Sequence, residues 1–137
     1  MYGMRGAAAY GRVSVESNVL SADPHKLIQL LFEGVQTAIR SAELHIENGQ
    51  TAEKGKAISK ALDIVNSGLL AALDKEQGGE IAEQLEAIYL YVSELLVKAN
   101  LHNDTSALTE ASELLEQIGS AWREIGPAAQ AKQAVGS

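Results

Sequence analysis

Three histidines are the side chains best suited to acid–base or metal chemistry: His25, His45 and His102. A carboxylate-bridged di-iron bundle needs Glu-x-x-His on two of its helices, but alanine stands three residues before each of these histidines. A phosphotransfer histidine would lie in the middle of a helix, and the turn signals described below place none of the three there. We therefore expect three surface histidines and no metal site.

Other stretches that resemble chemical motifs fail on their spacing or context. The two glycines within 49–56 are one residue too far apart for a phosphate-binding loop, and Ala57 stands where a hydroxyl would bind magnesium. The glycine pair at 78–79 lacks a dinucleotide-binding context, and the four glutamates within 76–86 have the pattern of a solvated helix face. Because no nucleophile, base and oxyanion donors can be grouped together, we expect no enzyme, no catalytic residue and no cofactor.

Composition favours one soluble domain. The chain has 137 residues, of which 46% are apolar, and no cysteine, so its core must hold without disulfides. Eleven basic residues scattered among eighteen acidic ones give a net charge of −7, which argues against nucleic acid. The acidic surface either only keeps the protein soluble or also favours a basic partner.

No stretch approaches the roughly 18 apolar residues that span a bilayer. Residues 1–12 contain no apolar run that could form the core of a signal peptide. We therefore expect a cytoplasmic protein that does not insert into a membrane.

Turn signals divide the chain into four helical segments. Asp23 is an N-cap before Pro24 at a first helical position, and Asn48 with Gly49 is a helix stop. We expect Thr51 to cap the second helix. The remaining signals are a break at 78–79, a turn and cap at 103–104, and a helix end at 126–127.

Apolar residues within these segments recur in steps of three and four, which is typical of a helix face packed against a neighbour. Short loops force such helices to run antiparallel. The sequence therefore predicts an all-α, antiparallel four-helix bundle over 21–126, between a partly mobile N-terminal tail or lid at 1–20 and a frayed C-terminal tail at 127–137. The expected core residues are Ile28, Phe32, Val35, Ile39, Ala42 and Ile46; Ile58, Leu62, Val65, Leu69 and Ala72; Ile81, Leu85, Ile88, Val92, Leu95 and Ala99; and Leu108, Ala111, Leu115, Ile118, Trp122 and Ile125.

The third helix is more apolar than one packed side requires. Leu90 and Val97 project almost opposite its core row, given about 100° per residue. A helix that is apolar nearly all round is a buried one. Either this helix is the centre of the bundle, covered by the N-terminal tail and the first helix, or it offers a groove to an amphipathic helix of another protein.

Short motifs in a fixed order resemble a known family, the flagellin-specific export chaperones called FliS. Each motif is weak alone, but their order and spacing over about residues 1–125 are specific. The motifs are Met1-Tyr2, Ala9-Tyr10, Val-Ser-Val-Glu-Ser at 13–17, Ser-Ala-Asp-Pro-His-Lys-Leu-Ile at 21–28, Phe32-Glu33-Gly34, Lys-Gly-Lys-Ala-Ile-Ser-Lys-Ala at 54–61, Leu-Asp-Lys-Glu-Gln-Gly-Gly-Glu-Ile-Ala at 73–82, Tyr89-x-Tyr91, Ala-Asn-Leu-His-Asn-Asp at 99–104, and Ala121-Trp122.

The resemblance implies a four-helix bundle that binds the C-terminal segment of flagellin in the cytosol. That segment is disordered in the monomer and helical in the filament, so capping it would prevent premature polymerisation and keep the subunit fit for export. The resemblance also implies presentation of the cargo to the export gate of the flagellar secretion apparatus. Two positions depart from the family's pattern: Leu90, where an aspartate is common, which would mark a surface position, and Leu95, where a basic residue is common.

We expect apolar residues of the second and third helices, with Tyr10 nearby, to form the flagellin-binding surface. The candidates are Tyr10, Leu62, Val65, Leu69, Ile88, Val92 and Val97, each of which could equally belong to the core. The N-terminal tail is expected to cover part of this surface through Tyr10 and Val13, unless it is disordered with and without the partner. The alternative function is a self-assembling structural bundle that uses the same face for homo-oligomers.

Overall fold

The computed structural model describes the backbone of residues 23–136 and the side chains of residues 23–126. All the regular elements of this part of the chain are helices, which confirms the all-α prediction. The predicted N-terminal tail, with Tyr10 and Val13, lies outside the described residues. The elements in chain order are α3 (Pro24–Glu47), α4 (Thr51–Asp63), the π-helix η1 (Ile64–Leu70), α5 (Lys75–His102) and α6 (Thr105–Gly136).

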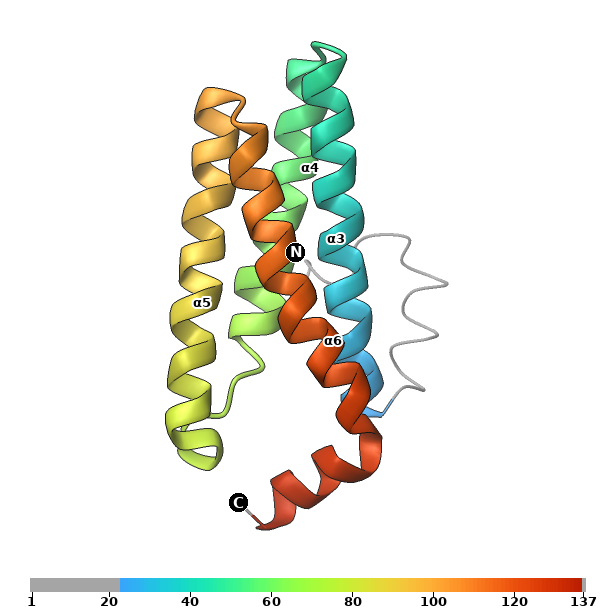
Figure 1. The fold of residues 1–137 in the computed structure, drawn as a ribbon, viewed down its shortest axis with the longest axis vertical. Helices are drawn as coiled ribbons and strands as arrows, with labels where there is room; N and C mark the ends of the chain where they lie inside the picture. The colour runs from blue at the N-terminus through green and yellow to red at the C-terminus, as the bar shows by residue number, and fades with distance from the viewer. Residues whose placement is uncertain (1–22, 137) are drawn as a thin grey trace.

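The helices form the expected bundle. In Figure 1, α3 and α5 rise from the lower end while α4 and α6 descend from the upper end, so consecutive helices run in opposite directions. The helix α3 packs mainly on α4 and α6, and α5 packs on α4, η1 and α6. The helix α5 is therefore a corner of the bundle rather than its centre, which argues against the alternative that α3 covers it; the N-terminal tail of that alternative lies outside the described residues.

Capping explains where α3 begins and ends. The Asp23 carboxylate accepts a hydrogen bond from the Lys26 amide at 2.7 Å, and Pro24 occupies the first helical position. At the other end Asn48 is the C-cap, and Gly49 takes a φ of +70°, a left-handed conformation that suits glycine. Both predicted signals are confirmed.

The second helix differs from the prediction in two ways. Its N-cap is Gln50 rather than Thr51, because the Gln50 carbonyl already accepts a bond from the Lys54 amide at 2.9 Å. The Gln50 side chain makes no capping bond; its Oε1 lies 2.7 Å from Nδ1 of His45. Beyond Asp63 the helix widens into η1, a π-helix that the apolar spacing does not reveal.

Glycines mark the breaks in the last two helices. Gly79 (φ +54°) interrupts α5 after one helical turn, and Gly126 (φ +70°) interrupts α6. Beyond Gly126 the chain turns beneath the bundle and stays helical to Gly136, where the sequence predicts a frayed tail (Figure 1). The turn between the helices is as predicted, with Asn103 left-handed at φ +53°.

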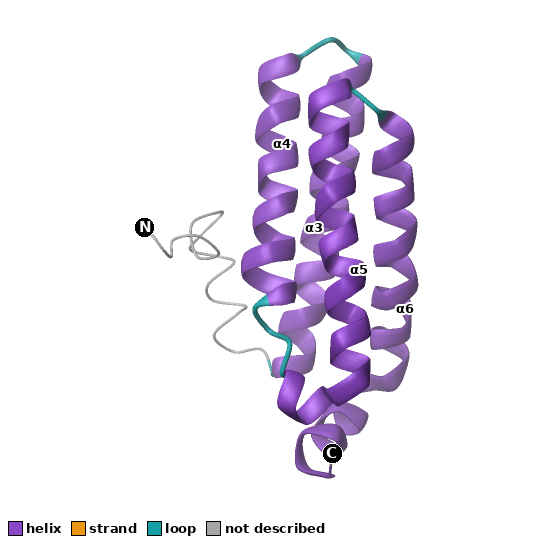
Figure 2. Cartoon of the chain, turned by 90° about the vertical axis from the view of Figure 1, so that its left-hand side faces the viewer, coloured by secondary structure: helices purple, strands orange, loops and turns teal. Residues whose placement is uncertain are grey.

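The core follows the predicted rows for most of their length. Among the expected residues the exceptions are Ala72, Ile81 and Ile125, which are exposed. Ile81 is 66% exposed, whereas the next residue of the same turn, Ala82, is buried; in Figure 2 the start of α5 lies below the loop that joins it to η1. The fully buried large side chains are Val35, Ile39, Ile58, Val65, Leu69, Val92, Leu96, Leu108 and Leu115.

His25 is buried, which corrects the expectation of three surface histidines. Its ring stacks on Trp122 with the ring centroids 4.9 Å apart, and Nε2 lies 2.7 Å from the Trp122 carbonyl oxygen. The Trp122 indole N–H donates in return to the His25 carbonyl at 2.9 Å. This pair joins the start of α3 to α6 near its break, whereas His45 is partly buried and His102 is exposed.

Candidate partner-binding surface

An apolar stripe runs along the outer face of α5. Leu90, Val97 and Leu101 are 49%, 45% and 71% exposed, respectively. Their spacing of seven and four residues places them on one side of the helix. At about 1.5 Å per residue the stripe is roughly 16 Å long, which matches about three turns of a docked helix.

The stripe forms one wall of a groove. Leu62 of α4 and Asn66 of η1 form the other wall, and the groove has a volume of about 710 Å³. Its apolar wall is edged by polar side chains of α5, so an amphipathic helix could bury its apolar side and keep its polar side in water. These polar residues are Ser93, Glu94, Lys98 and His102.

Polar contacts fix the spacing of the two walls. The Ser93 hydroxyl donates to Oδ1 of Asn66 at 3.0 Å, joining α5 to η1 within the groove. At the upper end the buried Lys54 ammonium donates to the Asn100 carbonyl at 2.9 Å and to Oδ1 of Asn103 at 2.8 Å. A cation is favourable there because helix C-termini carry partial negative charge.

These contacts give the motif at 99–104 a structural explanation. Ala99 is in the core, and the Asn100 carbonyl and Asn103 side chain hold Lys54. The two residues between them, Leu101 and His102, line the groove. One short segment therefore closes the turn and builds the upper end of the binding surface.

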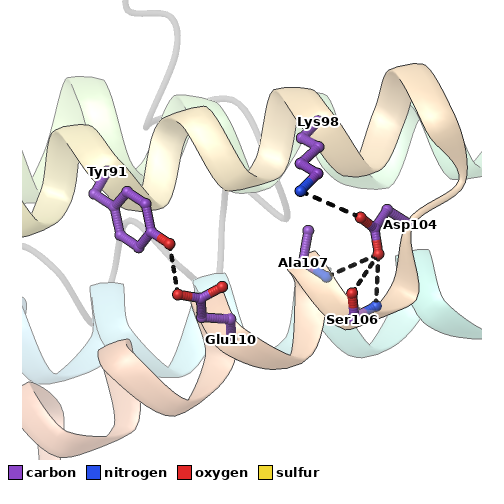
Figure 3. A network of polar contacts seen from close by, with 6 residues as sticks. All are labelled: Tyr91, Lys98, Asp104, Ser106, Ala107 and Glu110. Atoms are coloured by element: carbon purple, nitrogen blue, oxygen red, sulfur yellow. Dashed lines mark hydrogen bonds and ion pairs between the residues drawn. The ribbon is translucent and has the colours of Figure 1, made fainter.

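The side of α5 that faces α6 is tied by hydrogen bonds and an ion pair (Figure 3). The Tyr91 hydroxyl donates to Oε2 of Glu110 at 2.5 Å, and this bond raises the pKa of Tyr91 above its ordinary value. Asp104 accepts bonds from the Ser106 hydroxyl at 2.5 Å and the Ala107 amide at 3.2 Å, and lies 3.7 Å from the Lys98 ammonium. These contacts, that of the Ser106 hydroxyl above all, lower the pKa of Asp104.

The structure divides the predicted binding residues that it describes into three groups. Leu62 and Val97 line the groove, while Tyr10 lies outside the described residues. Ile88 is partly buried and packs against the core. Val65, Leu69 and Val92 are core residues, so a partner could contact them only if the bundle opened.

Two apolar residues of the groove, Leu90 and Leu101, are absent from the predicted set. Leu90 projects opposite the core row, and Leu101 continues the same side of the helix four residues after Val97. The spacing of Leu90, Val97 and Leu101, seven and four residues apart, is the feature of the sequence that indicates an apolar stripe on this side of the helix. Apolar residues on both sides of α5 obscured it, because the pattern alone does not say which side faces the core.

A second hollow lies between α3 and α6, with a volume of about 360 Å³. Its lining is mostly polar: Arg123 pairs with Glu116 at 3.0 Å, and the Arg40 guanidinium donates to the Thr37 hydroxyl at 3.2 Å. Gln36 and Ser112 exchange hydrogen bonds beside it at 2.9 and 2.7 Å. This hollow is thus a satisfied polar seam between helices, unlike the apolar groove.

Within residues 23–126, no three histidine or acidic side chains come together as a metal site would require. In the same described part, no helix is both long enough and apolar enough to cross a bilayer. Ser93, Glu94 and His102 all line the groove, but the Ser93 hydroxyl donates to Asn66 and not to either of the other two.

Comparison with known proteins gives a consistent result. A family model described as "Flagellar protein FliS" matches residues 6–129. The flagellar secretion chaperone FliS of Salmonella typhimurium is 48% identical over 129 residues, which cover 94% of this chain and 96% of that protein. Those of Escherichia coli and Bacillus subtilis are 40% and 30% identical, covering 90% and 80% of this chain and 91% and 80% of their own.

Proposed function

The chain belongs to the FliS family, a family of flagellar chaperones rather than enzymes, and from this premise we propose that it binds flagellin in the cytoplasm. The occupant of the groove between α4–η1 and α5 is the C-terminal segment of flagellin, held as an amphipathic helix. Binding prevents premature polymerisation, keeps the subunit export-competent, and lets the complex be presented to the flagellar export gate. The exposed apolar stripe of Leu90, Val97 and Leu101 is the observation that carries this proposal.

Physical chemistry supports a helix as the occupant. Contiguous exposed apolar surface edged by polar residues is typical of protein-binding sites, and a groove between two helices accepts a third through apolar residues spaced three and four apart. A disordered segment that folds on binding spends roughly 2–5 kcal/mol of its interaction energy on ordering. Such a complex can be specific and still release its cargo at the export gate.

The experiment that tests this function compares two flagellins. We expect full-length flagellin to co-purify with the chaperone, and flagellin that lacks its C-terminal segment to be lost from the eluate, because the groove then has no occupant. Equal recovery of both proteins would contradict the proposal. Circular dichroism of the truncated flagellin and its recovery in the soluble fraction control for aggregation.

A homo-oligomer that uses the same stripe is the alternative function. Light scattering separates the two, because the proposal predicts a monomer that becomes a one-to-one complex with flagellin. A stable oligomer that flagellin does not dissociate would favour the structural bundle.

The N-terminal segment 1–20 adds a second part to the proposal, in which Tyr10 and Val13 cover the groove before flagellin arrives. Deleting residues 1–12 should then tighten flagellin binding, since a competing segment is removed. Titration calorimetry on the shortened and full-length chains measures this effect. Unchanged affinity would argue against a covering role.

A further inference from the structure

Glu94 occupies an unusual place in the groove. It is the one carboxylate among the described residues that line the groove. It lies four residues after Leu90 and three before Val97, so it interrupts the apolar stripe on the same side of α5. In the described part of the chain it forms neither a hydrogen bond nor an ion pair.

A helix laid along the stripe would cover this carboxylate. Removing a charge from water is costly unless an opposite charge or hydrogen-bond donors replace the water. A partner that is wholly apolar on its docking side would therefore bind poorly. A partner with a cation at the facing position would gain an ion pair shielded from solvent.

Among the described residues, the cation one helical turn along the same helix is directed elsewhere. Lys98 stands one helical turn after Glu94, but its ammonium lies 3.7 Å from Oδ2 of Asp104, on the side of α5 that faces α6 (Figure 3). The exposed Tyr91 hydroxyl on that side is engaged by Glu110. Among the described residues this leaves Glu94 with neither a hydrogen bond nor an ion pair, so the groove has one negative charge within its apolar stripe, in a chain whose net charge is −7.

We infer that Glu94 selects a helix that carries a lysine or arginine within its apolar docking side. The inference rests on the proposed function and names the chemical class of segment that the groove accepts. The apolar stripe supplies most of the buried area, and the carboxylate sets the register of the bound helix and disfavours all-apolar segments.

Titration calorimetry with a peptide of the flagellin C-terminal segment tests this role. Glu94→Gln keeps the size and polarity of the side chain but removes its charge, and should weaken binding roughly fivefold, with less dependence on salt. Glu83→Gln is the matched control, because Glu83 is an exposed acid of the same helix outside the groove. It should leave binding unchanged.

Charge reversal identifies the partner of the carboxylate. Glu94→Lys should weaken binding more than Glu94→Gln does, and changing one lysine or arginine of the peptide to glutamate should restore it. If Lys98 served as the partner instead, Lys98→Met would reproduce the loss and no peptide reversal would rescue Glu94→Lys. That result, or binding as tight as wild type by Glu94→Gln, would overturn the inference.

A variant of the apolar stripe distinguishes this failure from failure of the proposed function. If Val97→Asp loses the peptide while Glu94→Gln retains it, the groove is correct and the role of Glu94 is wrong. If both folded variants bind as wild type does, the groove itself is not the flagellin site.

Discussion

Lys54 shows how one side chain supports the binding surface from beneath. It is buried, and its ammonium donates to a carbonyl near the end of α5 and to the side chain of Asn103 in the following turn. A buried charge without such partners would be strongly destabilising. The lysine therefore holds the upper end of α5, where Leu101 lines the groove, against α4.

Lys54→Met should lower the free energy of unfolding by about 1–3 kcal/mol, because it leaves the Asn100 carbonyl without its donor. Urea denaturation followed by circular dichroism measures the loss. Lys56→Met, at an exposed position of the same helix, should stay within about 0.5 kcal/mol of wild type. Equal stability of the two variants would show that the buried ammonium is not a structural tie.

Asp104 makes a pH-dependent contribution at the start of α6. Its folded-state pKa is lowered from 3.8, chiefly by the Ser106 hydroxyl, so the folded protein favours the ionised form. This contribution is fully present above the unfolded-state pKa and is lost as pH falls through the lowered folded-state pKa. Asp104→Asn keeps an acceptor that can cap the helix but has no carboxyl proton to gain.

The melting temperature of wild type should therefore fall more steeply than that of Asp104→Asn as pH drops below about 4, and the difference between them should be constant from about pH 5 to 7. Thermal melts across this range measure the two slopes. Parallel curves down to the lowest pH would contradict a lowered pKa for Asp104.

At the scale of elements, glycines decide how closely helices approach. A Cβ on Gly68 of η1 would lie 3.0 and 3.1 Å from the two methyl carbons of Leu31 in α3, whereas one on Gly55 of α4 would meet nothing within 4 Å. The missing side chain of Gly68 therefore lets η1 pack closely on Leu31 of α3, whereas no neighbour requires a glycine at position 55. Both lie in one continuous helical column, α4 followed by η1.

The same substitution should therefore have opposite effects at the two glycines. Gly55→Ala should stabilise the protein by roughly 0.5–1 kcal/mol through helix propensity. Gly68→Ala should destabilise it by about 1–3 kcal/mol, since Leu31 must move to make room. Chemical denaturation of both variants measures the difference, and stabilisation by both would show that the α3–η1 contact is loose.

The elements were largely predictable because their signals are local. The sequence indicates helix boundaries at Asp23, at Gly49 and at Asn103. The structure has Asp23 as the N-cap of α3 and the other two residues in the left-handed conformation. The π-helix was not predictable, since its apolar residues keep nearly the spacing of an α-helix. The burial of His25 was missed because it depends on Trp122, which is 97 residues away in the sequence.

At the scale of the whole molecule, the arrangement of the bundle decides which apolar residues are surplus. The sequence indicates more apolar residues on the third helix than one packed side requires. It correctly places Leu90 and Val97 opposite the core row of that helix. It did not distinguish Val65, Leu69 and Val92 from groove residues, because assignment to core or surface depends on which helices are neighbours. With α5 at a corner of the bundle, its outer side has no partner among the described helices.

The exposed stripe also offers the most direct test of the proposal. Val97→Asp combined with Leu101→Asp places two charges on it without touching the core, since both side chains are exposed. Leu44→Asp is the matched control, because Leu44 is 55% exposed on α3, away from the groove.

Titration calorimetry with the flagellin C-terminal segment, on variants whose circular dichroism spectra are native, measures the effect. The account predicts that the double variant binds at least about tenfold more weakly, the equivalent of about 1.4 kcal/mol, and that Leu44→Asp binds as wild type does. Wild-type affinity in the folded double variant would contradict it.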